Sequence, residues 1–150
     1  MPDYRNNAEL YEAVEDIPGE KAMFQKAAKI IMDYAKRNSQ SQGISILDLC
    51  CGTSAIIRSL QLDENKLIRS VTGVDINQAY LDFLTKKCDD ITMDAHVLYH
   101  GCGAETKFVI TDAVDYTHPS LVDIIIASSA YHHIEDERKL RFLEKVRDQL

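Results

Sequence analysis

The chain has 150 residues, 45% of them hydrophobic, and a formal net charge of −7. This length and composition suit a single globular domain with one core. Proteins that track nucleic-acid phosphates usually carry a basic patch, and the scattered Lys and Arg residues predict none, so we expect no nucleic-acid partner. We also expect no membrane partner and a cytoplasmic location. No apolar run has the length of a signal-peptide core or a bilayer span, and the four cysteines show no secreted disulfide pattern.

The first forty residues are predicted to be helical. A short amphipathic segment over residues 8–14 is interrupted by Pro18 and Gly19. Apolar side chains then recur at helical spacing, and the polar run 37–43 ends this helix. The apolar residues at this spacing are Ala22, Phe24, Ala27, Ile30, Ile31 and Tyr34.

From residue 44 onward, short apolar runs alternate with helical patterns. Strands are predicted over residues 44–49, 70–75, 107–113 and 122–129, and the last has the apolar composition of a central buried parallel strand. A helix is predicted to run through Leu60, with Thr53 or Ser54 as its N-cap. A second helix is predicted over 77–88 with Asn77 as its N-cap, and a third over 136–150. Residues 89–105 either extend the second helix or form an insertion. This alternation favours a doubly wound, mainly parallel α/β sheet.

The most informative segment is ISILDLCCGTSAI, residues 44–56. A buried strand passes through a turn of small residues around Gly52 into a helix, which leaves free backbone N–H groups at one point for an anionic or polar ligand. Asp48 stands near the end of this strand, and burial of its carboxylate is costly without hydrogen-bond donors. The loop amides and a ligand's amine or hydroxyls can supply them. A small-molecule site is therefore predicted at the carboxyl end of the strand.

Three successive predicted strands end in an acidic residue, namely Asp48, Asp75 and Asp112. Because the carboxyl ends of parallel strands open onto one edge, these side chains can converge on a single ligand. Asp75 lies roughly twenty residues beyond Gly52, where an acid is placed to bind two ribose hydroxyls. Ile76 is placed against an adenine face, and Asp112 with Ala113 is placed to hydrogen-bond the adenine edge.

These segments resemble the motifs of class I S-adenosylmethionine (SAM)-dependent methyltransferases over residues 44–150. The family's first motif, an acid followed by alternating glycines, matches DLCCGTS, with the small residues Cys50 and Ser54 in place of two glycines around Gly52. The second motif matches VTGVDI, the third FVITDAVDY and the fourth VDIIIASSAYHHI. The resemblance implies a Rossmann-like methyltransferase fold with a cofactor-binding α/β core over 44–150, and residues 1–43 resemble the helical lid of many small-molecule methyltransferases.

The resemblance also implies the roles of the site residues. SAM would be the cofactor, S-adenosylhomocysteine (SAH) the product, and a small molecule the acceptor of an in-line methyl transfer. Asp48 and the turn of Cys50, Gly52 and Ser54 would hold the methionyl end. Asp75 would bind the ribose, and Asp112 the adenine amino group. Ser128 and Ser129 would flank the methionyl part and the transferring methyl. Tyr11 is the candidate lid residue near the cofactor; the alternative is a tyrosine packed on the domain surface.

The predicted fourth strand is followed by the triplet Tyr131, His132 and His133. The acceptor is expected there, and a neutral His132 beside Tyr131 could take a proton from a hydroxyl or amine. The alternative is structural, with one histidine capping the next helix and the other packed in the turn.

No metal site is predicted, because His96, His100 and Cys102 lack the spacing of metal ligands. We expect Cys51 to be a small buried thiol that fills the turn, rather than a nucleophile.

Two other functions stay open. A nicotinamide dinucleotide-binding domain usually has glycine at the position of Cys50 and no acid at Asp48, although Ala55 could serve as its third small residue. The second is a non-catalytic, methyltransferase-like subunit completed by a partner. The sequence stops at the helix after the fourth motif, before the family's fifth strand and closing antiparallel pair, so the fourth strand is expected near an exposed edge. We expect a fragment of a longer enzyme, or else a partner or a homodimer that covers this edge.

Overall fold

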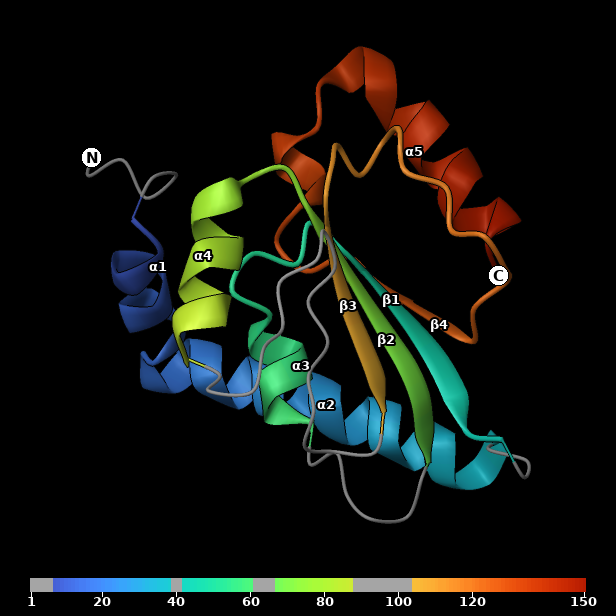
Figure 1. Cartoon of the computed structure of the whole chain (residues 1–150), viewed down its shortest axis with the longest axis horizontal. Coiled ribbons are helices and arrows are strands. Elements are labelled where there is room, and N and C mark those ends of the chain that lie inside the picture. Colours follow the sequence, from blue (N-terminus) through green and yellow to red (C-terminus); the bar gives the residue numbers. More distant parts are fainter. Residues whose placement is uncertain (1–6, 39–41, 61–66, 88–103) are drawn as a thin grey trace.

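The computed structural model describes residues 7–38, 42–60, 67–87 and 104–150. Two helices, α1 (Ala8–Glu15) and α2 (Pro18–Asn38), precede an alternation of strands and helices (Figure 1). The alternating elements are β1 (Ile44–Leu49), α3 (Ala55–Ser59), β2 (Ile68–Asp75), α4 (Gln78–Lys87), β3 (Glu105–Ile110), β4 (Ile124–Ile126), the short 3-10 helix η2 (Tyr131–His133) and α5 (Asp136–Asp148). The predicted α/β class is confirmed. The uncertain segment 89–105 lies almost wholly outside the described residues.

The described strands form one parallel sheet in the order β3-β2-β1-β4. On β1, Ile46 pairs with Val71 of β2 on one side and with Ile124 of β4 on the other. All six residues of β1 are buried. Parallel neighbours require crossover connections, and these bring the carboxyl ends of the strands to one edge of the sheet.

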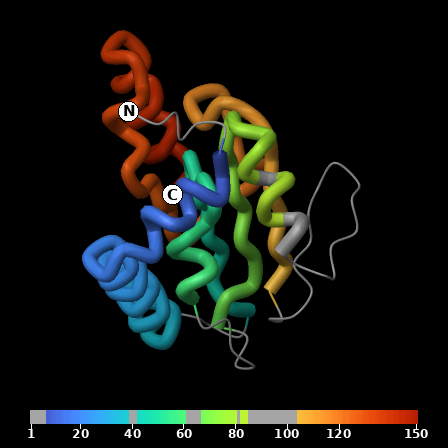
Figure 2. The backbone as a smooth tube through the Cα atoms, turned by 90° about the vertical axis from the view of Figure 1, so that its left-hand side faces the viewer, coloured from blue at the N-terminus to red at the C-terminus, as the bar shows by residue number. Residues whose placement is uncertain are grey.

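Helices cover both faces of this sheet, as a doubly wound fold requires. Successive residues of a strand point to opposite faces. Ile44 and Ile46 accordingly pack in a core cluster with α2 and α3, whereas Leu47 and Leu49 pack in a second cluster that includes Phe142 of α5. A third cluster joins α1 and α4 to β3. Figure 2 shows α1 and α2 beside the central strands, and α5 apart from these two helices.

Among the described strands, β4 lies at an edge of the sheet, as one prediction had it, and not at the central position that its apolar composition predicted. β4 is only three residues long and pairs with β1 alone among the described strands. β1 and β2 hold the central positions instead. The predicted strand 107–113 ends at Ile110, because its last partner on β2 is Asp75, which is the end of that strand. Asp112 therefore lies in the loop that follows β3.

The two predicted helix caps differ in outcome. Asn77 accepts a hydrogen bond on Oδ1 from the Ala79 N–H at 3.0 Å, which confirms it as the cap of α4. Ser54 occupies the N-cap position of α3 but makes no capping hydrogen bond, because its φ of 58° is left-handed rather than extended. The hydroxyl of Thr53 does not cap α3 either, since it donates to Glu15 of α1.

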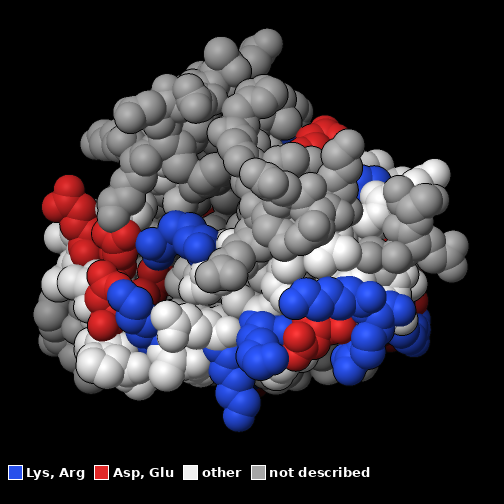
Figure 3. All heavy atoms as spheres, turned by 90° about the horizontal axis from the view of Figure 1, so that it is seen from below, with Lys and Arg blue, Asp and Glu red and all other residues white. Residues whose placement is uncertain are grey.

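The outer face of α2 carries opposite charges side by side. Lys29 pairs with Asp33 at 2.9 Å, and Lys21 pairs with Asp16 at 3.1 Å. Figure 3 shows this side of the molecule from below, with Lys and Arg side chains gathered around acidic ones. Such exposed pairs contribute little to stability. The buried face of α2 packs against β1 and α3 through Phe24, Ala28 and Ile31. The division into a lid over 1–43 and a core over 44–150 stays a prediction.

Candidate active site

The turn between β1 and α3 has an alternating backbone conformation. Cys50, Gly52 and Ser54 all have left-handed φ angles, of 58°, 53° and 58°. Glycine adopts this conformation without steric cost, whereas other L-residues there cost about 1–2 kcal/mol each. The turn thus keeps the path that alternating glycines favour, although two of the three positions carry a side chain. It is fixed by the Cys51 N–H, which donates to the Val74 carbonyl oxygen at 3.0 Å.

Asp75 joins this turn to the end of β2. Its Oδ2 accepts a hydrogen bond from the Gly52 N–H at 2.8 Å, and its Oδ1 accepts one from the Asn77 N–H at 2.9 Å. The Tyr11 ring of α1 covers the turn from outside, because a Cβ at Gly52 would lie 3.4 Å from it. Tyr11 also packs against Tyr80 of α4, with ring centroids 5.2 Å apart. Burial, followed by the negative charge of Glu15, raises the pKa of Tyr11 to about 12, so its hydroxyl stays protonated.

Asp48 is a buried carboxyl at the end of β1, with 3% of its surface exposed. Its side chain forms no hydrogen bond with the residues that the structure describes. Burial, with a contribution from the charge of Asp75, raises the pKa of Asp48 to about 8. A buried carboxyl of this kind favours either a bound proton or a cationic partner. It is therefore suited to an ammonium group of a ligand.

Asp112 is held from two sides in the loop after β3. Its Oδ1 accepts a hydrogen bond from the Val114 N–H at 2.8 Å, and its Oδ2 pairs with the Arg138 guanidinium of α5 at 2.7 Å. Burial would raise the pKa of this carboxyl, but the Arg138 hydrogen bond and the Val114 N–H lower it overall. Asp112 thus stays ionised and oriented at the edge of the sheet.

A cavity of about 440 Å³ opens at the carboxyl ends of the strands, within the range of small-molecule sites. Most of the predicted cofactor residues line it: Tyr11, Cys50, Gly52, Asp75, Ile76, Asp112, Ala113 and Ser128. Ile76 is 71% exposed, so its side chain is available to a ligand. Asp48 instead lines a second cavity of about 20 Å³, which shares Tyr11, Cys50, Ser128 and Ser129 with the first. Ser54 is among the lining residues of neither cavity.

The structure places His133 at the larger cavity, whereas neither His132 nor Tyr131 is among its lining residues. Successive residues of a 3-10 turn point about 120° apart, because the turn has three residues. Tyr131 packs towards Phe142 with ring centroids 6.4 Å apart, whereas the ring centroids of His132 and His133 lie only 3.8 Å apart. Glu135 stands at the N-cap of α5, so neither histidine caps that helix. The roles of His132 and Tyr131 stay predictions.

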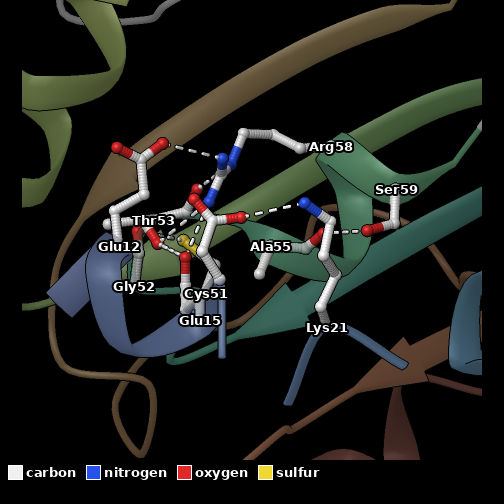
Figure 4. Close-up of polar contacts among 10 residues, drawn as sticks. Glu12, Glu15, Lys21, Cys51, Gly52, Thr53, Ala55, Arg58 and Ser59 are labelled. Atoms are coloured by element: carbon white, nitrogen blue, oxygen red, sulfur yellow. Dashed lines mark hydrogen bonds and ion pairs between the residues drawn. The ribbon is translucent and has the colours of Figure 1, made fainter. Parts of the chain in front are cut away.

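A charged network that the sequence reasoning missed connects α1 to the turn (Figure 4). Arg58 of α3 donates to Glu15 at 2.6 Å and to Glu12 at 3.1 Å, and its Nε donates to the Thr53 carbonyl oxygen at 2.9 Å. The Thr53 hydroxyl donates to the same Glu15 oxygen at 2.5 Å. One sequence signal for it exists. Glu15 lies two helical turns after Ala8, on the buried face of a short helix, where a charged residue requires a partner.

Within the described ranges, no group of three or more His, Cys, Asp or Glu side chains is arranged to hold a metal ion. His96, His100 and Cys102 lie outside those ranges. No helix among the described residues is long and apolar enough to span a bilayer.

Residues 46–150 match the model of a methyltransferase domain. The chain belongs to this methyltransferase family. No curated protein sequence matches the chain significantly.

Solved methyltransferase structures share the fold. A complex of DhpI with SAM and HEP superposes with a TM-score of 0.61 at 22% identity, covering 98% of this chain and 57% of that one. A SAM-dependent methyltransferase from Clostridium acetobutylicum gives 0.68 at 15% identity, covering 95% and 52%. The plantazolicin methyltransferase BpumL in complex with SAH gives 0.58 at 16% identity, covering 98% and 55%. This chain thus spans little more than half the length of each of these proteins.

Proposed function

We propose that the protein transfers a methyl group from SAM to a small-molecule acceptor. The observation that carries this proposal is the left-handed turn at Cys50, Gly52 and Ser54, which ends beside a cavity of about 440 Å³. Asp75 is hydrogen-bonded to this turn, and the buried Asp48 stands behind it. Family membership and the complexes of similar structures with SAM and SAH support the choice of cofactor.

The residues present fit this cofactor. The buried carboxyl of Asp48 has no hydrogen-bond partner among the described residues and suits the methionyl ammonium. Asp75 is already oriented by two backbone N–H groups and can accept hydrogen bonds from ribose hydroxyls. The exposed Ile76 and the neighbouring Ala113 line the same cavity and suit the two faces of an adenine ring. When bound, SAM supplies an electrophilic methyl group on a sulfonium.

The protein's part in the reaction is mainly orientation. An in-line displacement requires the acceptor atom, the methyl and the sulfur to be aligned, and such positioning contributes on the order of 7–11 kcal/mol. Tyr11 covers the turn and helps to exclude water from the methionyl end. A general base is needed only if the acceptor must lose a proton. His133 lines the cavity, which makes it the first candidate for this base; His132, next to it, is the second candidate.

Titration calorimetry with SAH and with NAD tests this proposal. We expect SAH to bind and NAD not to bind, because Cys50 stands where a dinucleotide fold usually requires glycine. Binding of NAD alone would overturn the proposal. A screen of hydroxyl, amine and carboxyl small molecules with methyl-labelled SAM then tests the acceptor class. Label transfer only to protein or RNA acceptors would contradict a small-molecule acceptor.

A further inference from the structure

The charged network on α1 reaches the methionyl end of the site. Glu15 is 9% exposed, and its Oε2 accepts the hydrogen bonds of both Thr53 and Arg58. The other oxygen, Oε1, makes no hydrogen bond to a described residue. The carboxylate is thus fixed in position by one oxygen while the second stays available.

Glu15 also lines the small cavity that Asp48 lines. This cavity has a volume of about 20 Å³, enough for a group of the size of water or ammonium. Tyr11, Cys50 and Ser128 line both this cavity and the larger one. A ligand in the larger cavity can therefore extend a small polar group to both carboxyl side chains.

The charge balance favours a cation at this point. Arg58 is a single positive charge that pairs with two carboxylates, Glu12 and Glu15. Asp48 adds a further acidic group. A bound ammonium would compensate the excess negative charge.

We propose that Glu15 of α1 is a cofactor-binding residue that contacts the methionyl ammonium of SAM together with Asp48. Arg58 and Thr53 are positioning residues that hold its carboxylate at the small cavity. The contact makes the N-terminal helix part of the cofactor site, so occupation of the site stabilises α1 in its place over the turn. The proposal rests on the proposed function, and it names the residue of α1 that contacts the cofactor.

The test compares SAH with 5′-methylthioadenosine, which has the adenosine part but no amino-acid group. Calorimetry measures the affinities of both ligands for the wild type and for Glu15→Gln. We expect the variant to bind SAH about tenfold or more weakly, the loss of a charge-assisted hydrogen bond. The affinity for 5′-methylthioadenosine should change by less than about twofold, because that ligand has no amino-acid group to enter the small cavity and contact residue 15.

Glu12→Gln is the matched control. Glu12 lies on the same helix and pairs with the same arginine, but it is not a lining residue of the small cavity. Glu12→Gln should weaken SAH binding much less than Glu15→Gln does, because it removes a charge beside Arg58 but no group that lines the small cavity. The affinity for 5′-methylthioadenosine should again change by less than about twofold. Glu15→Asp keeps the charge but withdraws the carboxylate by one methylene, so it should weaken SAH binding in the same selective way. Thermal unfolding of each variant shows that it is folded.

The outcomes separate this inference from the proposed function. Unchanged SAH affinity in both Glu15 variants would overturn the contact while leaving the proposed function intact. Equal losses for SAH and 5′-methylthioadenosine would also overturn it, because Glu15 would then act only through the packing of α1. A wild type that binds neither ligand would overturn the proposed function itself.

Discussion

Replacing Asp48 with asparagine removes a buried titratable group from the end of β1. Burial, with the charge of Asp75, raises the pKa of Asp48 from 3.8 to about 8. An acid with a higher pKa in the folded state stabilises the fold fully below its unfolded pKa and loses this contribution as the pH rises through its folded pKa. Each pH unit in the window between about 4 and 8 lowers the free energy of unfolding by about 1.4 kcal/mol, so the complete shift amounts to roughly 5–6 kcal/mol.

Denaturant unfolding of the wild type and of Asp48→Asn between about pH 5 and pH 8 measures this effect. The difference in the free energy of unfolding should change by about 1.4 kcal/mol per pH unit, in favour of the variant as the pH rises. Taking the difference removes the contributions of carboxyl groups that titrate alike in both proteins. A difference that stays flat across this range would refute a raised pKa at Asp48.

The same proton links Asp48 to the cofactor. An ammonium beside Asp48 requires the ionised carboxylate, so binding of SAH releases a proton at a pH below about 8. The affinity should then rise with pH by up to about tenfold per unit between roughly 6 and 8. Calorimetry in two buffers of different ionisation enthalpy counts the released protons. Asp48→Asn should bind more weakly and without this release, and an equal release from the variant would refute the assignment.

Three further substitutions test the turn and the sheet. Ser54→Gly should have a free energy of unfolding about 1 kcal/mol higher than Ser54→Ala, because both remove the hydroxyl but only glycine tolerates the left-handed φ without cost; equal values by denaturant unfolding would contradict this. Gly73→Ala places a Cβ 2.5 Å from the Phe108 ring, and calorimetric or denaturant unfolding should show a loss of about 1–3 kcal/mol. Asp75→Ala should weaken SAH binding by about tenfold or more, a charge-assisted contact of roughly 1.5–3 kcal/mol. Unchanged affinity in a folded Asp75→Ala protein would show that the ribose is held elsewhere.

The sequence predicts strand positions better than strand ends. The predicted strand 44–49 coincides with β1, whose six residues are all buried and four of which are apolar. β3 stops at Ile110, before the predicted end at residue 113, because β2 offers no partner beyond Asp75. β4 pairs only with residues 46–48 of β1, although β1 runs from Ile44 to Leu49. The residues at which a strand ends depend on its pairing with a neighbouring strand, so the strand's own sequence does not predict them.

The site shows the same division between local and distant information. The positions of Asp48, Asp75 and Asp112 near one edge of the sheet follow from the pattern of the chain, because parallel strands end at one edge. The sequence does not show that Asp48 lines the small cavity while Asp75 and Asp112 line the larger one. Which of the two histidines lines the larger cavity depends on the rotation of a single 3-10 turn, and the sequence of two adjacent histidines does not predict that rotation.

The contact of Arg58 with Glu15 joins residues 43 positions apart, on two short helices that meet only when the chain is folded. A short helix such as α1 is only marginally stable alone, and most of its stability comes from tertiary packing. Glu15 is buried on α1 only because Thr53 and Arg58 satisfy one of its oxygens. The residue that holds the helix in place is thus the same residue that we expect to contact the methionyl ammonium. A ligand that provides this cation should therefore stabilise α1 more than adenosine alone, as measured by protection of the α1 amides from hydrogen exchange. Equal protection by SAH and by 5′-methylthioadenosine would show that the helix responds only to the filling of the larger cavity.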